Sequence, residues 1–111
     1  MSPHAIFRAD ASPKIGAGHI MRCMALADSL MRDGWQCTFA ATAATHDTMP
    51  QLAKTPYHQI QLEDDAWDRP DALMEGAGQP CNLLIVDHYG LDRIYETSCR
   101  SFAEKILVVD D

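Results

Sequence analysis

Apolar residues along the chain follow two patterns, short continuous runs that predict buried strands and runs at three- and four-residue spacing that predict helices. The clearest helical run covers residues 19–32, and Gly34 is expected in a left-handed conformation just after it. The clearest buried strand covers residues 82–87. Further strands are predicted at residues 4–8, 35–41, 57–62 (an edge strand) and 105–109 (a second buried strand). Further helices are predicted at residues 48–54, from residue 67 or 70 to residue 76, and at residues 91–103.

Strands and helices therefore alternate along the chain, which is typical of an α/β domain built on a parallel sheet with helices on both faces. Right-handed crossovers favour a Rossmann-like sheet of about five strands in the order 3-2-1-4-5. We assign residues 1–111 to one such domain. The last predicted strand ends at the edge where binding residues usually lie, so we expect the chain to be the first half of a longer protein.

Composition narrows the class of protein. The chain is 47% hydrophobic and 23% charged, which is ordinary for a globular protein. Its formal net charge of −7 disfavours a nucleic-acid partner. Neither a membrane-spanning run nor a signal peptide is evident, so we expect a cytoplasmic protein without a membrane partner. The four cysteines lack metal-binding or redox spacing and are expected to be buried free thiols.

The strongest local signal is the segment Gly16-Ala17-Gly18-His19, which follows a predicted strand and opens a predicted helix. Gly16 can supply the positive φ of a tight turn, and Gly18 lets a ligand approach the backbone closely. A helix that starts here points free N–H groups towards an anion. The segment lacks the third glycine of a dinucleotide fingerprint and the Gly-Lys-Ser/Thr of a P-loop. The alternative is a turn that only packs the helix against the strand.

His19 adds chemistry to this loop. The positive end of the helix favours a neutral imidazole, which can take a proton from water as a general base. The alternative is a histidine without chemistry in the first turn of the helix. Arg22 lies on the same helix face and can orient an anionic group or pair with a surface carboxylate.

A second cluster, Asp87-His88-Tyr89-Gly90, follows the fourth predicted strand. In the predicted order this strand lies beside the first, so Asp87 and His88 should face the His19 loop. Alternatively, Asp87 caps the helix that follows. Asp10 belongs to the same edge, as do Asp110 and Asp111. Because no fixed ligand spacing supports a magnesium site, we expect neither a metal nor a cofactor.

Together these segments resemble a known family. The matching segments are Phe7-Arg8-Ala9-Asp10, Ile15-Gly16-Ala17-Gly18-His19-Ile20-Met21-Arg22, Ile85-Val86-Asp87-His88-Tyr89-Gly90 and Val109-Asp110-Asp111. In this order they are similar to the N-terminal part of the UDP-2,4-diacetamido-2,4,6-trideoxy-β-L-altropyranose hydrolases of pseudaminic acid biosynthesis, a pathway that supplies flagellin glycosylation. Related proteins are often described as spore-coat polysaccharide biosynthesis proteins.

The resemblance implies the N-terminal half of a GT-B-type enzyme with two Rossmann-like domains. Such an enzyme releases UDP from its sugar by attack of water, with inversion and without a metal. His19 then corresponds to the general base, and Tyr89 to a residue near the sugar. Substrate contacts are expected from Asp10, Gly16, Gly18, Arg22, His88 and Tyr89. The family holds UDP mainly through a C-terminal domain that these residues do not include, so the 111 residues alone should be inactive.

Two other functions remain open at this point. The chain can be half of a GT-B glycosyltransferase, in which an acceptor takes the place of water. It can also be a non-catalytic sugar-nucleotide-binding or assembly domain that works with another chain, as a bare sheet edge would favour.

Overall fold

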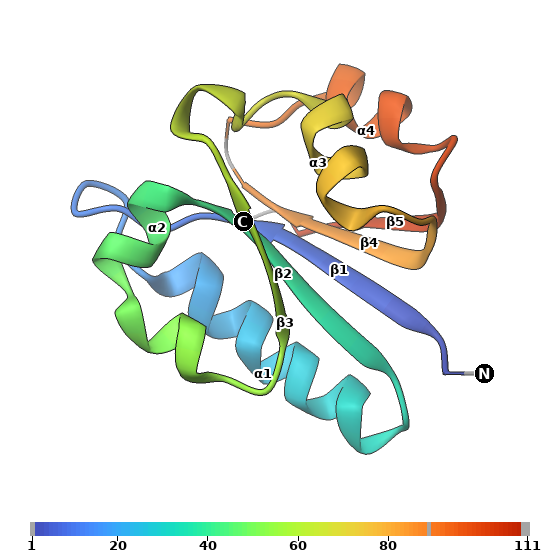
Figure 1. Cartoon of the computed structure of the whole chain (residues 1–111), viewed down its shortest axis with the longest axis horizontal. Helices are drawn as coiled ribbons and strands as arrows, with labels where there is room; N and C mark the ends of the chain where they lie inside the picture. Colours follow the sequence, from blue (N-terminus) through green and yellow to red (C-terminus); the bar gives the residue numbers. More distant parts are fainter. Residues whose placement is uncertain (1, 89, 110–111) are drawn as a thin grey trace.

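The computed structural model describes residues 2–88 and 90–109, and its centre is a five-stranded parallel sheet in the order β3-β2-β1-β4-β5 (Figure 1). The predicted fold class and strand order are therefore confirmed. The strands are β1 (His4–Ala9), β2 (Gln36–Thr42), β3 (His58–Leu62), β4 (Cys81–Asp87) and β5 (Ala103–Val108). The helices are α1 (Gly18–Arg32), α2 (Ala43–Thr48), α3 (Pro70–Ala77) and α4 (Arg93–Cys99), with short 3-10 turns η1 (Pro50–Lys54) and η2 (Asp64–Ala66).

Helix α1 covers one face of the sheet, and α3 and α4 cover the other (Figure 1). On the α1 face, Phe39 stacks between Phe7 and Tyr57, with ring centroids 4.9 Å apart in both pairs. On the opposite face, Ile6 and Leu84 pack under the second helical layer. Each such apolar side chain contributes about 1.5–3 kcal/mol when it is fully buried. The central strands are therefore covered on both sides, which explains their continuous apolar runs.

The carboxyl ends of β1, β2 and β4 meet at one edge of the sheet. The ladder between β1 and β4 pairs Ala9 with Asp87, and the ladder between β1 and β2 pairs Arg8 with Ala40. The residues that follow these strands therefore lie close together although they are distant in sequence. This edge corresponds to the switch point of an open parallel sheet, where ligands usually bind.

Two of the predicted helices had wrong boundaries. In the predicted helix at 48–54, residues 50–54 form the 3-10 turn η1, and Thr48 is instead the last residue of α2. Helix α2 begins earlier because the Thr42 side chain caps it by accepting a hydrogen bond from Thr45 N–H. The predicted helix at 91–103 is only α4. The apolar spacing of the predicted helix extends to Phe102 because this residue packs into the same core as Cys99. Phe102 itself lies in a non-helical turn after α4.

Strand β5 was predicted to be buried and is not. Leu107 is 45% exposed and Val108 is 36% exposed. The reason is position, because β5 is the outer neighbour of β4 in the described sheet. Sequence hydrophobicity alone cannot distinguish a central strand from an apolar edge strand. The expectation for strand 57–62 was correct, since β3 lies at the other edge.

Three smaller predictions also have an outcome. Gly34 follows α1 with a φ of 90°, as expected for a left-handed residue after a helix. All four cysteines are buried and free. In the described part of the chain, none of the helices has the length and apolar character needed to cross a membrane. Asp110 and Asp111 lie outside the described residues.

Candidate functional site

The loop between β1 and α1 closes on itself before the helix begins. Gly16 N–H donates to the Ser12 carbonyl at 2.7 Å, and Ile15 N–H donates to Ser12 Oγ at 3.1 Å. Gly16 has a φ of 78°, so the predicted need for a left-handed residue at this turn is confirmed. The turn brings the chain back to the first turn of α1 beside the sheet edge.

Gly18 differs from Gly16 in its structural requirements. It is the first residue of α1, its φ is not positive, and a Cβ built on it would meet no atom within 4 Å. Neither packing nor backbone geometry in the described chain requires a glycine there. The N-cap residue Ala17 provides no side-chain hydrogen bond, and the first turn contains no acidic residue. The positive end of α1 is thus not neutralised by its own first turn.

His19 lies at this helix start and is almost fully buried, with 7% of its surface exposed. Its Nδ1 atom makes a short contact with Oδ1 of Asp87, which is itself completely buried at the end of β4. The predicted approach of Asp87 to the His19 loop is therefore correct. The alternative role of Asp87 as a helix cap is not, because Asp92 caps α4 by accepting from Tyr95 N–H.

Arg22 holds the same carboxylate from the next helical turn. Its Nε donates to Asp87 Oδ2 at 2.5 Å, and its Nη2 donates to Oδ1 at 2.6 Å. Burial tends to raise the pKa of Asp87, but hydrogen bonds from Arg22 and His19 hold that pKa below its usual value. Asp87 is therefore an ionised acceptor, and Arg22 pairs with a buried carboxylate rather than a surface one.

The tautomer of His19 follows from this geometry. An ionised carboxylate only accepts hydrogen bonds, so the close contact with Asp87 requires a proton on Nδ1. A bare Nδ1 would instead place two lone pairs against each other. Arg22 Nη2 also lies 3.3 Å from His19 Nδ1, but with that nitrogen protonated both atoms are donors, so this contact is not a hydrogen bond. In the neutral ring, Nε2 is then the unprotonated nitrogen, which is the protonation pattern of an oriented general base.

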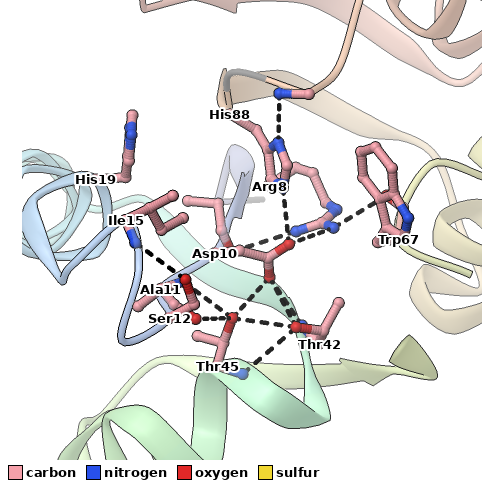
Figure 2. Close-up of polar contacts among 12 residues, drawn as sticks. Arg8, Asp10, Ala11, Ser12, Ile15, His19, Thr42, Thr45, Trp67 and His88 are labelled. Carbon is pink, nitrogen blue, oxygen red and sulfur yellow. Dashed lines mark hydrogen bonds and ion pairs between the residues drawn. The ribbon is translucent and has the colours of Figure 1, made fainter. Parts of the chain in front are cut away.

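A second network surrounds Asp10 (Figure 2). Its Oδ2 accepts from Arg8 Nη2 at 2.8 Å and from His88 Nε2 at 2.9 Å. Its Oδ1 accepts from Thr42 N–H at 2.9 Å, Thr42 Oγ1 at 3.2 Å and Thr45 Oγ1 at 2.8 Å. Burial opposes the charge of Asp10, but these donors, led by His88 and Arg8, keep its pKa well below the usual value. Asp10 thus joins the ends of β1, β2 and β4.

The predicted site residues separate into two groups. Gly16, Gly18, His19 and Arg22 lie on the α1 side of the edge, together with Asp87. Asp10 and His88 lie in the second network, and Figure 2 shows His19 apart from it. Both oxygens of Asp10 already accept hydrogen bonds from the protein, so its substrate contact stays a prediction. Tyr89 lies outside the described residues.

Sequence reasoning gave no structural role to Arg8, Thr42, Thr45 or Trp67. Arg8 is fully buried, and its guanidinium also donates to the carbonyls of Ala40 and Trp67 at 3.2 and 3.0 Å. A signal for Arg8 was available, because a charged residue within an apolar strand needs a buried partner. Asp10 follows two positions later, on the same face of the strand. No comparable signal marks Thr45 or Trp67, whose roles arise from tertiary packing.

Among the described residues, no group of three or more histidine, cysteine, aspartate or glutamate side chains is arranged to hold a metal ion. Asp10 and Asp87 are each occupied by cationic or hydrogen-bonding partners of their own. Comparison of the chain with protein-family models, with curated proteins and with solved structures found no match.

Proposed function

We propose that this domain is the N-terminal, water-activating half of a GT-B-type enzyme that hydrolyses a UDP-linked 2,4-diacetamido-2,4,6-trideoxy hexose. The observation that carries the proposal is the pair formed by His19 and Asp87 beside the glycine loop. A buried carboxylate that accepts from one imidazole nitrogen fixes the ring and its tautomer, as in an oriented general base. The motif resemblance supplies the substrate class.

In the proposed reaction, a water molecule lies near His19 Nε2. Its oxygen attacks the anomeric carbon of the sugar from the side opposite to UDP. His19 takes a proton from the water as the new carbon–oxygen bond forms. The bond between the anomeric carbon and the β-phosphate oxygen breaks, and UDP leaves with the bonding electrons. The free sugar therefore has inverted anomeric configuration.

Each neighbouring residue has a role in this proposal. Asp87 holds the His19 ring and stabilises the imidazolium that forms during attack. Arg22 keeps Asp87 ionised and in place through its two donor atoms. The uncapped start of α1 and the open space at Gly18 suit the close approach of an anionic sugar nucleotide. No metal takes part in the proposed step.

The direct test uses the protein encoded by the complete open reading frame that contains these residues. It is incubated with the UDP-sugar in water enriched in oxygen-18, without any acceptor. We expect UDP release with the label in the anomeric hydroxyl of the sugar and none in UDP. Label in a phosphate group would instead indicate cleavage at phosphorus and contradict the proposal.

The same assay separates the two alternatives. A glycosyltransferase releases UDP at a useful rate only when an acceptor is added. A binding or assembly domain releases none, although it can still bind the nucleotide sugar. UDP release is also measured with the 111-residue chain alone. We expect no measurable turnover from it, because the proposed nucleotide half is not among these residues.

A further inference from the structure

His88 looks at first like a second candidate base, because it follows Asp87 and contacts the carboxylate of Asp10. Its surroundings lead to a different role. We propose that His88 is a positioning residue, locked as the neutral Nε2–H tautomer, that holds the turn at Gly90 against the buried Arg8–Asp10 pair and the ring of Trp67. The importance of this turn for turnover rests on the function proposed above, whereas the lock itself does not.

The first part of the lock is the Arg8–Asp10 pair. Arg8 is fully buried, and its Nη2 atom lies 2.8 Å from Asp10 Oδ2. The ionised Asp10 carboxylate offers only acceptors. His88 Nε2 lies 2.9 Å from the same oxygen, so this nitrogen must carry a proton.

The second part is the backbone of the turn. Gly90 N–H donates to His88 Nδ1 at 3.0 Å. A backbone amide can only donate, so Nδ1 must be unprotonated. The two contacts together allow one protonation state of the ring, with Nε2 protonated and Nδ1 bare. Both nitrogens already have protein partners, which makes His88 unsuited to take a proton from water.

The third part is Trp67. Its ring stacks on the His88 ring with centroids 5.4 Å apart and an interplanar angle of 16°. The Trp67 carbonyl accepts from Arg8 Nη2 at 3.0 Å, so Trp67 contacts both His88 and Arg8. Figure 2 shows Trp67 and His88 on either side of the Arg8 guanidinium.

Gly90 completes the arrangement. A Cβ added at this position would lie 2.6 and 2.9 Å from two ring carbons of Trp67, and 3.1 Å from Cε1 of His88. These distances are too short for the stacked rings to remain in place. An alanine at position 90 would therefore displace the Trp67 ring from its stack on His88.

The lock holds His88 and Gly90, which follow Asp87 at the end of β4. In the proposed function, Tyr89 is expected near the sugar. A loosened turn should then weaken sugar binding more than it slows the chemical step. His88→Gln, which cannot reproduce both ring contacts, and Gly90→Ala should raise KM by roughly five- to tenfold with a smaller change in kcat. Trp67→Phe, which keeps an aromatic stack, should remain close to the parent protein, whereas Trp67→Ala should resemble Gly90→Ala.

The lock is tested without substrate by long-range proton–nitrogen NMR of the histidine-labelled chain near neutral pH. The His88 signals are identified by their loss in His88→Gln. We expect a protonated Nε2 and an unprotonated Nδ1, and slow exchange of the Gly90 amide that becomes fast in His88→Gln. A proton on Nδ1, in either the other tautomer or the imidazolium, would overturn the proposal. So would an unchanged KM in both His88→Gln and Gly90→Ala. If the complete protein releases no UDP, the proposed function fails, and the NMR result alone decides the lock.

Discussion

The side chains of His19 and Asp87 share a buried hydrogen bond although the two residues are 68 positions apart in the chain. The contact exists because β1 and β4 are neighbours in the sheet, which places the start of α1 beside the end of β4. Asp87 is completely buried and also held by Arg22. The contact with Asp87 fixes the orientation of the His19 ring at the start of α1.

The role of Asp87 can be tested by one isosteric substitution. Asp87→Asn keeps the side-chain shape but removes the charge that pairs with Arg22 and stabilises an imidazolium. We expect kcat for UDP release by the complete protein to fall by at least about tenfold, with little change in KM. Steady-state kinetics provide the measurement.

Asp92→Asn is the matched control for that substitution. Asp92 caps α4 by accepting from Tyr95 N–H and does not contact His19. An asparagine caps a helix about as well as an aspartate, so both stability and kcat should stay near those of the parent. Equal kcat values for the two variants would remove Asp87 from the proposed mechanism.

The two glycines of the loop should respond in opposite ways to alanine. Gly16→Ala forces a Cβ into a backbone with φ of 78° and should lower the free energy of unfolding by about 1 kcal/mol. Gly18→Ala meets open space and should leave stability unchanged or slightly higher. If Gly18 admits a ligand to the backbone, its alanine variant should nevertheless raise KM. Thermal unfolding and kinetics of both variants check this, and normal KM in Gly18→Ala would make the glycine a simple helix-start residue.

Asp10 should make stability depend on pH in the acid range. Its pKa in the folded protein lies below the ordinary value of 3.8, so the ionised carboxylate stabilises the fold above that pH. The stabilisation is lost as the pH falls below that value and the folded group takes up a proton. In urea unfolding between about pH 6 and pH 3, Asp10→Asn should therefore be less stable than the parent at the upper end, and the difference should shrink on acidification.

Asp71→Asn is the comparison for that experiment. Asp71 also has a lowered pKa, through its hydrogen bond from Arg69, but both side chains are largely exposed, at 69% and 62%. Exposed pairs contribute little because solvent screens them. An acid dependence as large for Asp71→Asn as for Asp10→Asn would argue against the buried network.

The cysteines should be unreactive in the folded chain. Burial raises the pKa of the Cys23 thiol to about 12 and that of Cys99 to about 11. Since the thiolate is the reactive form, a thiol-specific reagent near neutral pH should label the native protein very slowly. Addition of denaturant should expose all four thiols. Rapid labelling of any cysteine without denaturant would show that its core opens readily.

The sequence predicted the part of this structure that depends on hydrophobic periodicity and chain topology. The predicted strand order alone places the end of β4, and with it Asp87, near His19. Gly16 and Gly34 were predicted from the turn chemistry that requires a positive φ. These features are local or follow from right-handed crossovers, so they can be read from one chain.

The residues that the sequence did not reveal act through tertiary contacts. Trp67 lies in a loop, yet it stacks on His88 and accepts from Arg8. Thr45 is completely buried because α2 carries it against Asp10. Likewise, nothing in the apolar run at 105–109 distinguished an edge strand from a central one. Such assignments require the spatial neighbours of each residue, which periodicity does not provide.

The most direct test of the central claim is the turnover of His19→Ala in the complete protein, measured as UDP release from the UDP-linked diacetamido trideoxy sugar. Loss of a general base should reduce kcat by roughly 10² to 10⁴. KM should change little, because the histidine handles water and not the nucleotide. Turnover near that of the parent protein would contradict the account and leave His19 as a structural residue at the start of α1.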